Sequence, residues 1–279
     1  MPSIPANEEI KPRTDSSDME QLDFFLCTMS NYSYKDDQAT MEAPIFSLAT
    51  REDLKIWRWT SVDGRKSVEV IPSLYGRATI RDKDILIYAT SQLLAGLNSG
   101  LPTCRTVKFV AYDYLMATHR GVRGEDYRAM RDGLDRLKGT SLKTNIYTSG
   151  LNSTSSFGLI DNYRIIERSS TDARMIAIEM TLSQWLYNAI EAKEVLTIPS
   201  DYFLLRKPLE RRLYEIARKH VGRQGMWKVS LATLASKCGS TTTRLRKFRE
   251  AMNHASKADN LPEYRITILG PNEILFSGR

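Results

Sequence analysis

The sequence contains few residues of the kinds that disulfide-bonded, metal-binding and membrane-spanning proteins need. Its 279 residues include three cysteines and three histidines, all widely spaced. Cysteines in this number and spacing fit no disulfide framework and no metal-ligand motif, so we expect three reduced, mostly buried thiols. No apolar run approaches the ~18 residues that span a bilayer, and the polar N-terminus lacks the apolar core of a secretory signal. We therefore expect a cytoplasmic protein, away from membranes, without a metal or other cofactor.

Motifs that are typical of enzymes are also missing. The chain has no G-x-x-x-x-G-K-[ST] phosphate-binding loop and no G-x-S-x-G nucleophile elbow. His119, His220 and His254 stand apart from one another, so no histidine cluster of the kind that nicking initiators use is present. The sequence predicts no catalytic residue and no enzyme. The remaining enzymatic hypothesis is a nicking initiator that uses Tyr112 or Tyr127.

The positive charge of the chain is concentrated in its last quarter. Residues 200–279 contain 16 Lys and Arg against 7 Asp and Glu, whereas residues 1–199 contain 24 against 26. A localised basic excess favours a polyanionic partner, and nucleic acid fits it best. The other interpretation is a basic face that only keeps the protein in solution.

The order of expected elements predicts an α+β protein with two winged-helix domains in tandem. Residues 1–21 are polar and without apolar periodicity, which predicts a disordered arm. Residues 22–80 form a β-rich segment with short strands at 44–49, 54–59 and 66–71, and Asp63-Gly64 is a hairpin turn signal. A helix from residue 82 capped by Asp82, a strand at 105–109, helices at 112–118 and 125–138, and strands at 141–148, 157–166 and 175–180 follow. This is the order of a winged helix, so residues 22–199 are the expected first domain.

The same order recurs in residues 200–279, the expected second domain. A helix begins at Pro208, a strand covers 227–229, and Ser230 can cap a short helix. Cys238-Gly239 forms a turn before a helix that Ser240 can cap and that buries Leu245, Phe248 and Met252. Strands at 264–269 and 273–277 form the second wing.

The second domain carries the most specific candidates for DNA contacts. In a helix-turn-helix unit the N-terminal part of the second helix enters the major groove, where Arg reads guanine and Thr reaches base edges. A serine hydroxyl and backbone N–H groups at the helix start can hold a phosphate. The candidates are Ser240, Thr241, Thr242, Thr243, Arg244, Arg246, Lys247 and Arg249, with Lys228 and Lys237 upstream and Arg265 in the wing.

The corresponding helix of the first domain carries charges of both signs. Arg123, Arg128 and Arg131 are secondary candidates for DNA contacts. Mixed charge beside apolar wing strands fits a protein–protein or dimer contact equally well. An adaptor whose first domain only mediates dimerisation therefore stays open.

Several stretches of the chain resemble the plasmid replication initiator protein A family. They are residues 84–92, 124–127, 136–140, 157–161, 196–198, 202–203 and 206–220, with 22–25 near the N-terminus. The resemblance covers roughly residues 22–260, and the run Arg206-Lys207-Pro208-Leu209-Glu210 with its continuation to His220 is the most specific part.

The resemblance implies an initiator that binds direct repeats of an origin through two winged-helix domains. Such proteins promote opening of an adjacent AT-rich duplex, recruit the host initiator, helicase or primase, and exchange between monomer and dimer. The resemblance also implies that DNA contacts come from residues 240–249 and that no dedicated catalytic residue exists. The alternative from the same class is a sequence-specific transcriptional repressor that opens no origin.

Overall fold

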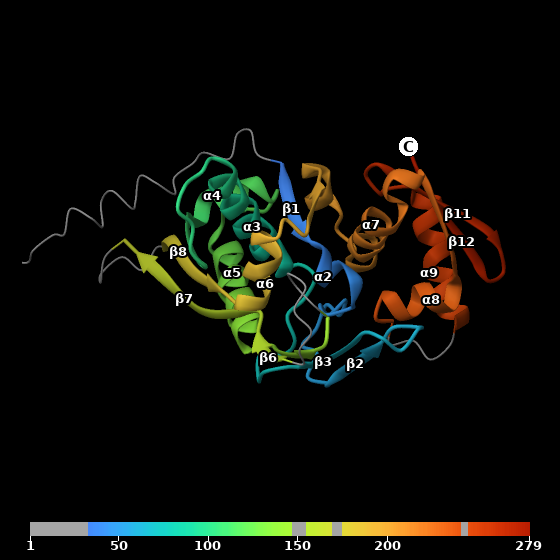
Figure 1. Cartoon of the computed structure of the whole chain (residues 1–279), viewed down its shortest axis with the longest axis horizontal. Helices are drawn as coiled ribbons and strands as arrows, with labels where there is room; N and C mark the ends of the chain where they lie inside the picture. The colour runs from blue at the N-terminus through green and yellow to red at the C-terminus, as the bar shows by residue number, and fades with distance from the viewer. Residues whose placement is uncertain (1–32, 147–154, 169–174, 241–244) are drawn as a thin grey trace, which may run out of the picture.

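The computed structural model describes residues 33–146, 155–168, 175–240 and 245–279, and Figure 1 shows them as two lobes side by side. We call residues up to 199 the first unit and residues from 200 the second unit; this boundary itself stays a prediction. The expected arm at 1–21 and the resembling stretch at 22–25 lie outside the described residues.

The first unit contains a three-stranded antiparallel sheet and a four-stranded antiparallel sheet. The helices are α2 (Gln38–Glu42), α3 (Lys83–Asn98), α4 (Ala111–Ala117), α5 (Gly124–Gly139) and α6 (Gln184–Glu191). The strands are β1 (Tyr34–Asp37), β2 (Trp57–Thr60), β3 (Ser67–Ile71), β4 (Thr106–Val110), β5 (Ser141–Thr144), β6 (Ser155–Gly158), β7 (Ile160–Glu167), β8 (Met175–Leu182) and β9 (Val195–Ile198). The sheet orders are β4-β8-β7 and β2-β3-β5-β6, while β1 pairs with β9 alone.

The second unit repeats the order of part of the first, namely α3, β4, α4 and α5 followed by the hairpin β7-β8. It contains a 3-10 turn (Ser200–Leu204), α7 (Pro208–Val221), a second 3-10 turn (Gly222–Gln224), β10 (Met226–Ser230), α8 (Leu231–Lys237), α9 (Leu245–Ala258), β11 (Tyr264–Gly270) and β12 (Glu273–Gly278). Its sheet order is β10-β12-β11, so the last strand lies in the middle, as β8 does in the first unit. Each unit therefore contains a helix, a strand, two helices and a later hairpin, although in the first unit β5 and β6 precede the hairpin and α6 and β9 follow it. The α+β class is confirmed.

Most of the expected elements are present, with three differences. No strand covers 44–49; Ser47 makes only an isolated bridge to Thr79. Asp82 precedes α3 but does not cap it, because its carboxylate accepts hydrogen bonds from Thr79 N and from Arg136 instead. The expected strand at 157–166 is divided into β6 and β7, which belong to different sheets.

Local sequence explains why the helices begin where they do. Ser183 accepts a hydrogen bond from Leu186 N and caps α6. Ser230 accepts one from Thr233 N and caps α8, as expected. Asp126 accepts a hydrogen bond from Arg123 N at 2.9 Å, which caps the first turn of α5. Pro208 occupies the first turn of α7, where its missing N–H costs nothing.

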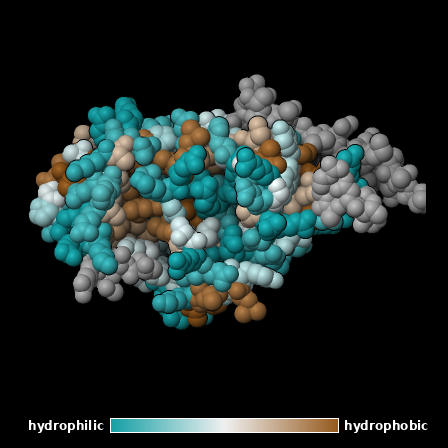
Figure 2. Space-filling model, turned by 180° about the vertical axis from the view of Figure 1, so that it is seen from behind, coloured by the Kyte–Doolittle hydropathy of each residue, from teal (hydrophilic) through white to brown (hydrophobic). Residues whose placement is uncertain are grey.

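Two apolar cores hold the structure, and the second extends into the first unit. The first core lies among α3, α5 and the two sheets of the first unit. The second core surrounds α7, α8 and α9, but it also contains Met41, Ile87 and Ile198 of the first unit. The face of the molecule opposite to that in Figure 1 is mainly hydrophilic, with apolar residues gathered in small patches (Figure 2). The units therefore share buried apolar surface rather than meeting through a polar contact alone.

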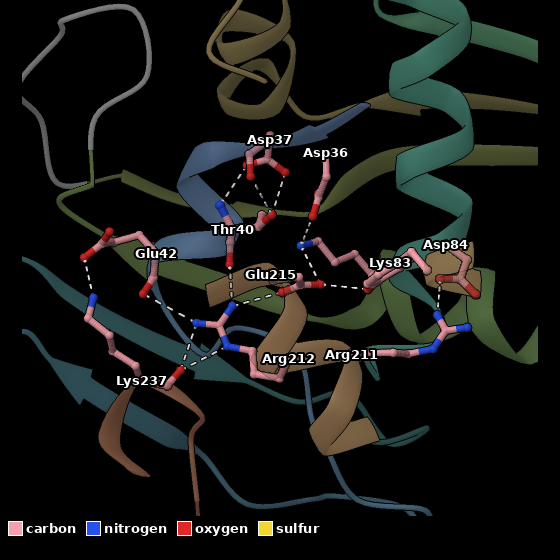
Figure 3. Close-up of polar contacts among 11 residues, drawn as sticks. Asp36, Asp37, Thr40, Glu42, Lys83, Asp84, Arg211, Arg212, Glu215 and Lys237 are labelled. Carbon is pink, nitrogen blue, oxygen red and sulfur yellow. Dashed lines mark hydrogen bonds and ion pairs between the residues drawn. The ribbon is translucent and has the colours of Figure 1, made fainter. Parts of the chain in front are cut away.

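Buried ion pairs also join the two units. Lys83 Nζ lies 2.7 Å from Asp36 Oδ2 and 3.0 Å from Glu215 Oε1, and all three side chains are buried (Figure 3). Glu215 also pairs with Arg212 at 3.0 Å and accepts a hydrogen bond from Tyr202 Oη at 2.9 Å. Each charge in this cluster thus has a partner of opposite sign, as burial requires.

A second set of buried contacts extends from the same helix. Arg211, next to Arg212 on α7, pairs with Asp84 of α3, and its other nitrogens donate to Phe203 O and Leu205 O. Asp84 also pairs with Arg120 at 2.9 Å. The family-like stretch 206–220 therefore supplies most of the second unit's charges at the junction, which Lys237 also joins (Figure 3).

We expect Lys83→Met to lower the free energy of unfolding by about 3–5 kcal/mol, because it leaves the buried carboxylates of Asp36 and Glu215 without their shared cation. Denaturant unfolding followed by tryptophan fluorescence measures this. The control is Arg164→Met, which removes an exposed ion pair with Glu179 and should cost no more than about 1 kcal/mol. Equal losses in the two variants would contradict a structural role for the buried cluster.

Candidate nucleic-acid interface

Helix α9 is amphipathic and presents its charged side to solvent. Phe248, Met252 and Ala255 are buried against the second core. Leu245 is 41% exposed, so the expectation that it faces the core is wrong: it is the first residue of the described helix and lies beyond the packed part of the core. The packed face fixes the rotation of α9 and leaves the basic residues of its first turn outside.

Two of the expected DNA-contacting side chains on α9 are exposed. Arg246 is 73% exposed, and its Nε lies 3.8 Å from Glu250 Oε1. Lys247 is exposed and makes neither a hydrogen bond nor an ion pair with other residues that the structure describes. Because an exposed pair of this length contributes little stability, both cations can turn toward an anionic partner.

Arg249, on the same helix, already forms hydrogen bonds within the second unit. Its Nε donates to Pro271 O at 2.7 Å, and its Nη2 donates to Asn272 Oδ1 at 3.1 Å. These hydrogen bonds tie α9 to the turn between β11 and β12. Asn272 O in turn accepts a hydrogen bond from Leu231 N at 2.8 Å. The structure therefore gives Arg249 a positioning role, in which it holds the final hairpin against the helix.

Lys228 and Arg265 are exposed on the sheet of the second unit. Lys228 pairs with Glu273 at 2.9 Å, and Arg265 pairs with Asp259 at 3.5 Å. Both cations are more than half exposed, so these pairs are weak and can be exchanged for contacts with phosphate.

Lys237 requires a correction. Its Nζ lies 3.1 Å from Glu42 Oε1 and its side chain is only 14% exposed, so it faces the first unit and not an external partner. Its carbonyl oxygen also accepts hydrogen bonds from Arg212. Lys219 pairs with the same carboxylate at 3.1 Å. Burial raises the pKa of Glu42, but the attraction of Lys219 and Lys237 outweighs burial and lowers it to about 2.

The segment expected to begin the recognition helix is described only in part. Thr241, Thr242, Thr243 and Arg244 lie outside the described residues, as does any cap that Ser240 makes on the helix. Ser240 itself follows α8, where its backbone N donates to Ala235 O at 3.0 Å.

Burial sets the pKa values of Cys238 and His220 in the second unit. Burial raises the pKa of the Cys238 thiol to about 12, so it is an inert packed thiol. Burial also lowers the pKa of His220 to about 4, and the ring stacks on Trp227. Of the other expected buried thiols, Cys104 is exposed and Cys27 lies outside the described residues.

The first-unit candidates occupy the other lobe. Arg123 and Arg128 are exposed at the start of α5, and Arg131 pairs with Glu167 of β7 at 2.7 Å. Figure 1 shows α5 and α9 in separate lobes, so the two candidate sets form two separate patches. The charges of the first patch are partly balanced by neighbours of its own unit.

Two further sequence expectations bear on the described residues. Over the described ranges, no three His, Cys, Asp or Glu side chains are arranged to hold a metal ion. Among the described helices, none is both long and apolar enough to cross a bilayer.

The turn between α8 and α9 is held close to the first unit. Gly239 has φ +67°, and a Cβ on it would lie 2.6 Å from Pro44 Cβ. Trp59 Nε1, on β2, donates to Ser236 Oγ of α8 at 3.1 Å. Contacts with the first unit therefore fix the end of α8 and the turn at Gly239.

Gly239→Ala should lower the free energy of unfolding by about 2–4 kcal/mol, because it combines a left-handed backbone conformation with a clash against Pro44. Gly225→Ala is the matched control, since Gly225 has φ +73° but open space around the missing Cβ, and should lose only the backbone part, about 1–2 kcal/mol. Thermal and denaturant unfolding measure both. A Gly239 variant no less stable than the Gly225 variant would show that the turn is not tightly packed.

Comparisons with known proteins identify the family. The family model "Replication initiator protein A" matches residues 35–266. The chain belongs to this family. A putative replication protein of Wigglesworthia glossinidia brevipalpis is 38% identical over 237 residues, which cover 84% of each chain. The resemblance that the sequence suggested is thus confirmed.

Solved structures of replication initiators share the fold of this family member. Two structures of domains 2 and 3 of RctB match with TM-scores of 0.58 and 0.60 at 13% and 14% identity, covering 86% of this chain and 97% and 95% of theirs. The Pi initiator protein, solved in complex with iteron DNA, matches with a TM-score of 0.52 at 15% identity over 72% of this chain and 90% of that one. At these identities the likeness concerns the fold.

Proposed function

We propose that this family member is a plasmid-type replication initiator that binds direct repeats in duplex DNA through two winged-helix domains. Membership of the replication initiator family over residues 35–266 carries the proposal. The solved Pi initiator complex with iteron DNA supports a DNA partner, because the fold of that protein resembles this one.

The repeated topology supports the winged-helix assignment. In the second unit, β10 follows α7, two helices follow β10, and β11 and β12 form a hairpin whose second strand pairs with β10. In the first unit, α3, β4, α4, α5 and the hairpin β7-β8 have the same order, and β8 pairs with β4. In this arrangement α5 and α9 are the recognition helices, and β7-β8 and β11-β12 are the wings. A wing held to its helix, as Arg249 holds the β11-β12 turn, would meet DNA as one rigid body with α9.

The exposed cations assign roles within this interface. We propose that Arg246 and Lys247 contact bases or phosphates from α9, with Thr241, Thr242, Thr243, Arg244 and Ser240 at its start. Lys228 and Arg265 contact neighbouring phosphates from the sheet and wing. Arg123, Arg128 and Arg131 make a second contact with DNA or with another copy of the chain.

The proposal extends from binding to initiation. Bound at repeats, the protein would open an adjacent AT-rich duplex, recruit the host initiator, helicase or primase, and exchange between monomer and dimer. No catalytic residue takes part, because each step is one of binding and distortion of DNA.

Selection from random duplex DNA should recover one motif with the full chain. The Arg246→Gln/Lys247→Gln variant should bind that motif more weakly, by about 1–3 kcal/mol for each side chain that reads a base. Its binding should also fall less steeply with salt, since fewer counterions are released. Fluorescence anisotropy over a salt series measures both.

The matched control for this test is Lys193→Gln/Arg223→Gln. It removes the same charge from exposed residues outside α9 and should bind like the unaltered protein. If the control loses as much affinity as the α9 variant, the protein binds polyanions through its positive charge and does not read the DNA sequence. A full chain that enriches no motif would overturn the proposal.

Opening of DNA separates an initiator from a protein that only occupies its site. On supercoiled plasmid with the selected motif repeated beside an AT-rich stretch, we expect permanganate to modify thymines of that stretch when the protein is bound. The same plasmid with scrambled repeats is the control. Binding of the protein without permanganate modification of these thymines would instead indicate a sequence-specific repressor that opens no DNA.

A further inference from the structure

A cavity of about 720 Å³ lies where the first unit meets the start of α7. Its wall comes from the loop at 47–52, the segment at 75–82 before α3, one face of α5, and Arg120 and Pro208. Cavities of roughly 300–1,000 Å³ are typical of sites for small molecules. No residue of α9 lines it, although Lys247 lines a neighbouring hollow that shares Ser47, Ala49 and Arg77 with it.

Arginine dominates the charged residues around this cavity. Five arginines line it against two carboxylates, Glu52 and Asp82, which leaves an excess of three positive charges. The arginines are Arg51, Arg77, Arg81, Arg120 and Arg136.

Carboxylates balance this group only in part. Arg136 is held by both oxygens of Asp82, at 2.7 and 2.8 Å. Arg77 pairs with Asp53 at 2.9 Å, and Arg120 shares Asp84 with Arg211. Arg51 and Arg81 are exposed at the rim and form no ion pair with other described residues.

Two arginines of the wall also have hydrogen-bond donors without acceptors. Arg77 is only 3% exposed, and its Nε and Nη1 have no hydrogen-bond partner among the described residues. The same holds for Nε of Arg120. These nitrogens have almost no accessible surface, so a ligand in the cavity does not reach them, and the two guanidinium groups lie over the rings of Trp57 and Tyr114 instead.

Burial and neighbouring charges shift the pKa values of the arginines in the wall. Burial lowers the pKa of Arg77, and burial together with Arg211 and Arg120 lowers the pKa of Arg81. By contrast, Tyr114 and Asp84 outweigh burial and raise the pKa of Arg120, and Asp82 raises the pKa of Arg136, so among these wall arginines repulsion from other arginines falls on Arg81 at the rim. An anion in the cavity would relieve the repulsion.

We propose that this cavity binds the phosphate groups of a free nucleotide-sized molecule. Phosphate oxygens match the planar fork of arginine and can satisfy several guanidinium groups at once. Tyr75, 62% exposed at the rim, offers an aromatic face to the rest of the ligand. A cavity walled by the loop at 47–52, the segment before α3 and α5 favours a small ligand over a phosphate of the DNA backbone, which stays at the surface of a duplex.

The cavity lies at the junction of the two units. Arg81 Nη1 donates to Arg206 O at 3.4 Å, and Pro208 at the start of α7 forms part of the wall. A ligand in the cavity therefore contacts both the first unit and the chain that leads into α7, and it stabilises the folded junction by mass action.

Isothermal titration of the full chain without DNA tests this site, with pyrophosphate, AMP and ATP as probes and adenosine as the unphosphorylated control. We expect the phosphorylated probes to bind with a Kd below about 1 mM, and adenosine to bind at least about tenfold more weakly. Arg51→Gln/Arg81→Gln should weaken ATP binding by about tenfold or more. Both residues are exposed, so the variant should keep its thermal unfolding midpoint.

The matched control is Arg58→Gln/Arg65→Gln, which neutralises two exposed arginines of the same unit outside the cavity and should leave ATP binding unchanged. No binding of any phosphorylated probe would overturn the proposal. So would an equal loss of ATP binding in both variants. Because DNA is absent from the titration, its result does not depend on whether the protein binds an origin.

Discussion

The buried ammonium of Lys83, held between Asp36 and Glu215, is the contact on which the arrangement of the two units depends. These side chains come from β1, α3 and α7, three elements far apart in the chain. Removing charges from water is costly, so the cluster is stable only when all three elements are in place. The surrounding core adds apolar contacts from both units, among them Ile87 and Ile198. Together they make the junction specific in geometry as well as stable.

That junction fixes what the second unit can present to a partner. Lys237 and Lys219 point inward to Glu42, which fastens α7 and α8 to the first unit. Gly239 lets the next turn pack on Pro44, and α9 follows from there. The cations left outside, Arg246 and Lys247, project from a helix that packs on the core of the second unit. The candidate DNA surface depends on contacts that themselves touch no DNA.

The sequence predicted the elements well because their signals are local. Apolar periodicity, Ser183, Ser230 and Pro208 mark helices that are present, and the repeated order of elements emerged from them. What failed depends on tertiary partners. Asp82 looks like a cap but binds Arg136 from α5, and Lys237 looks like an exposed cation but binds Glu42, almost two hundred residues away in the chain. Charge type is visible in a sequence, whereas the partner of a charge is not.

For the same reason, the amino-acid composition of the first unit does not reveal the arginine-lined cavity. The first 199 residues carry slightly more acidic than basic residues, which suggests no anion site. Folding separates these charges, because Asp36 and Glu42 are used at the junction with lysines while Arg51, Arg77 and Arg81 converge on the cavity. The arginines lie on loops and helices between residues 51 and 136, so no motif contains them. A local excess of charge can therefore arise in a nearly balanced unit when its carboxylates are engaged elsewhere.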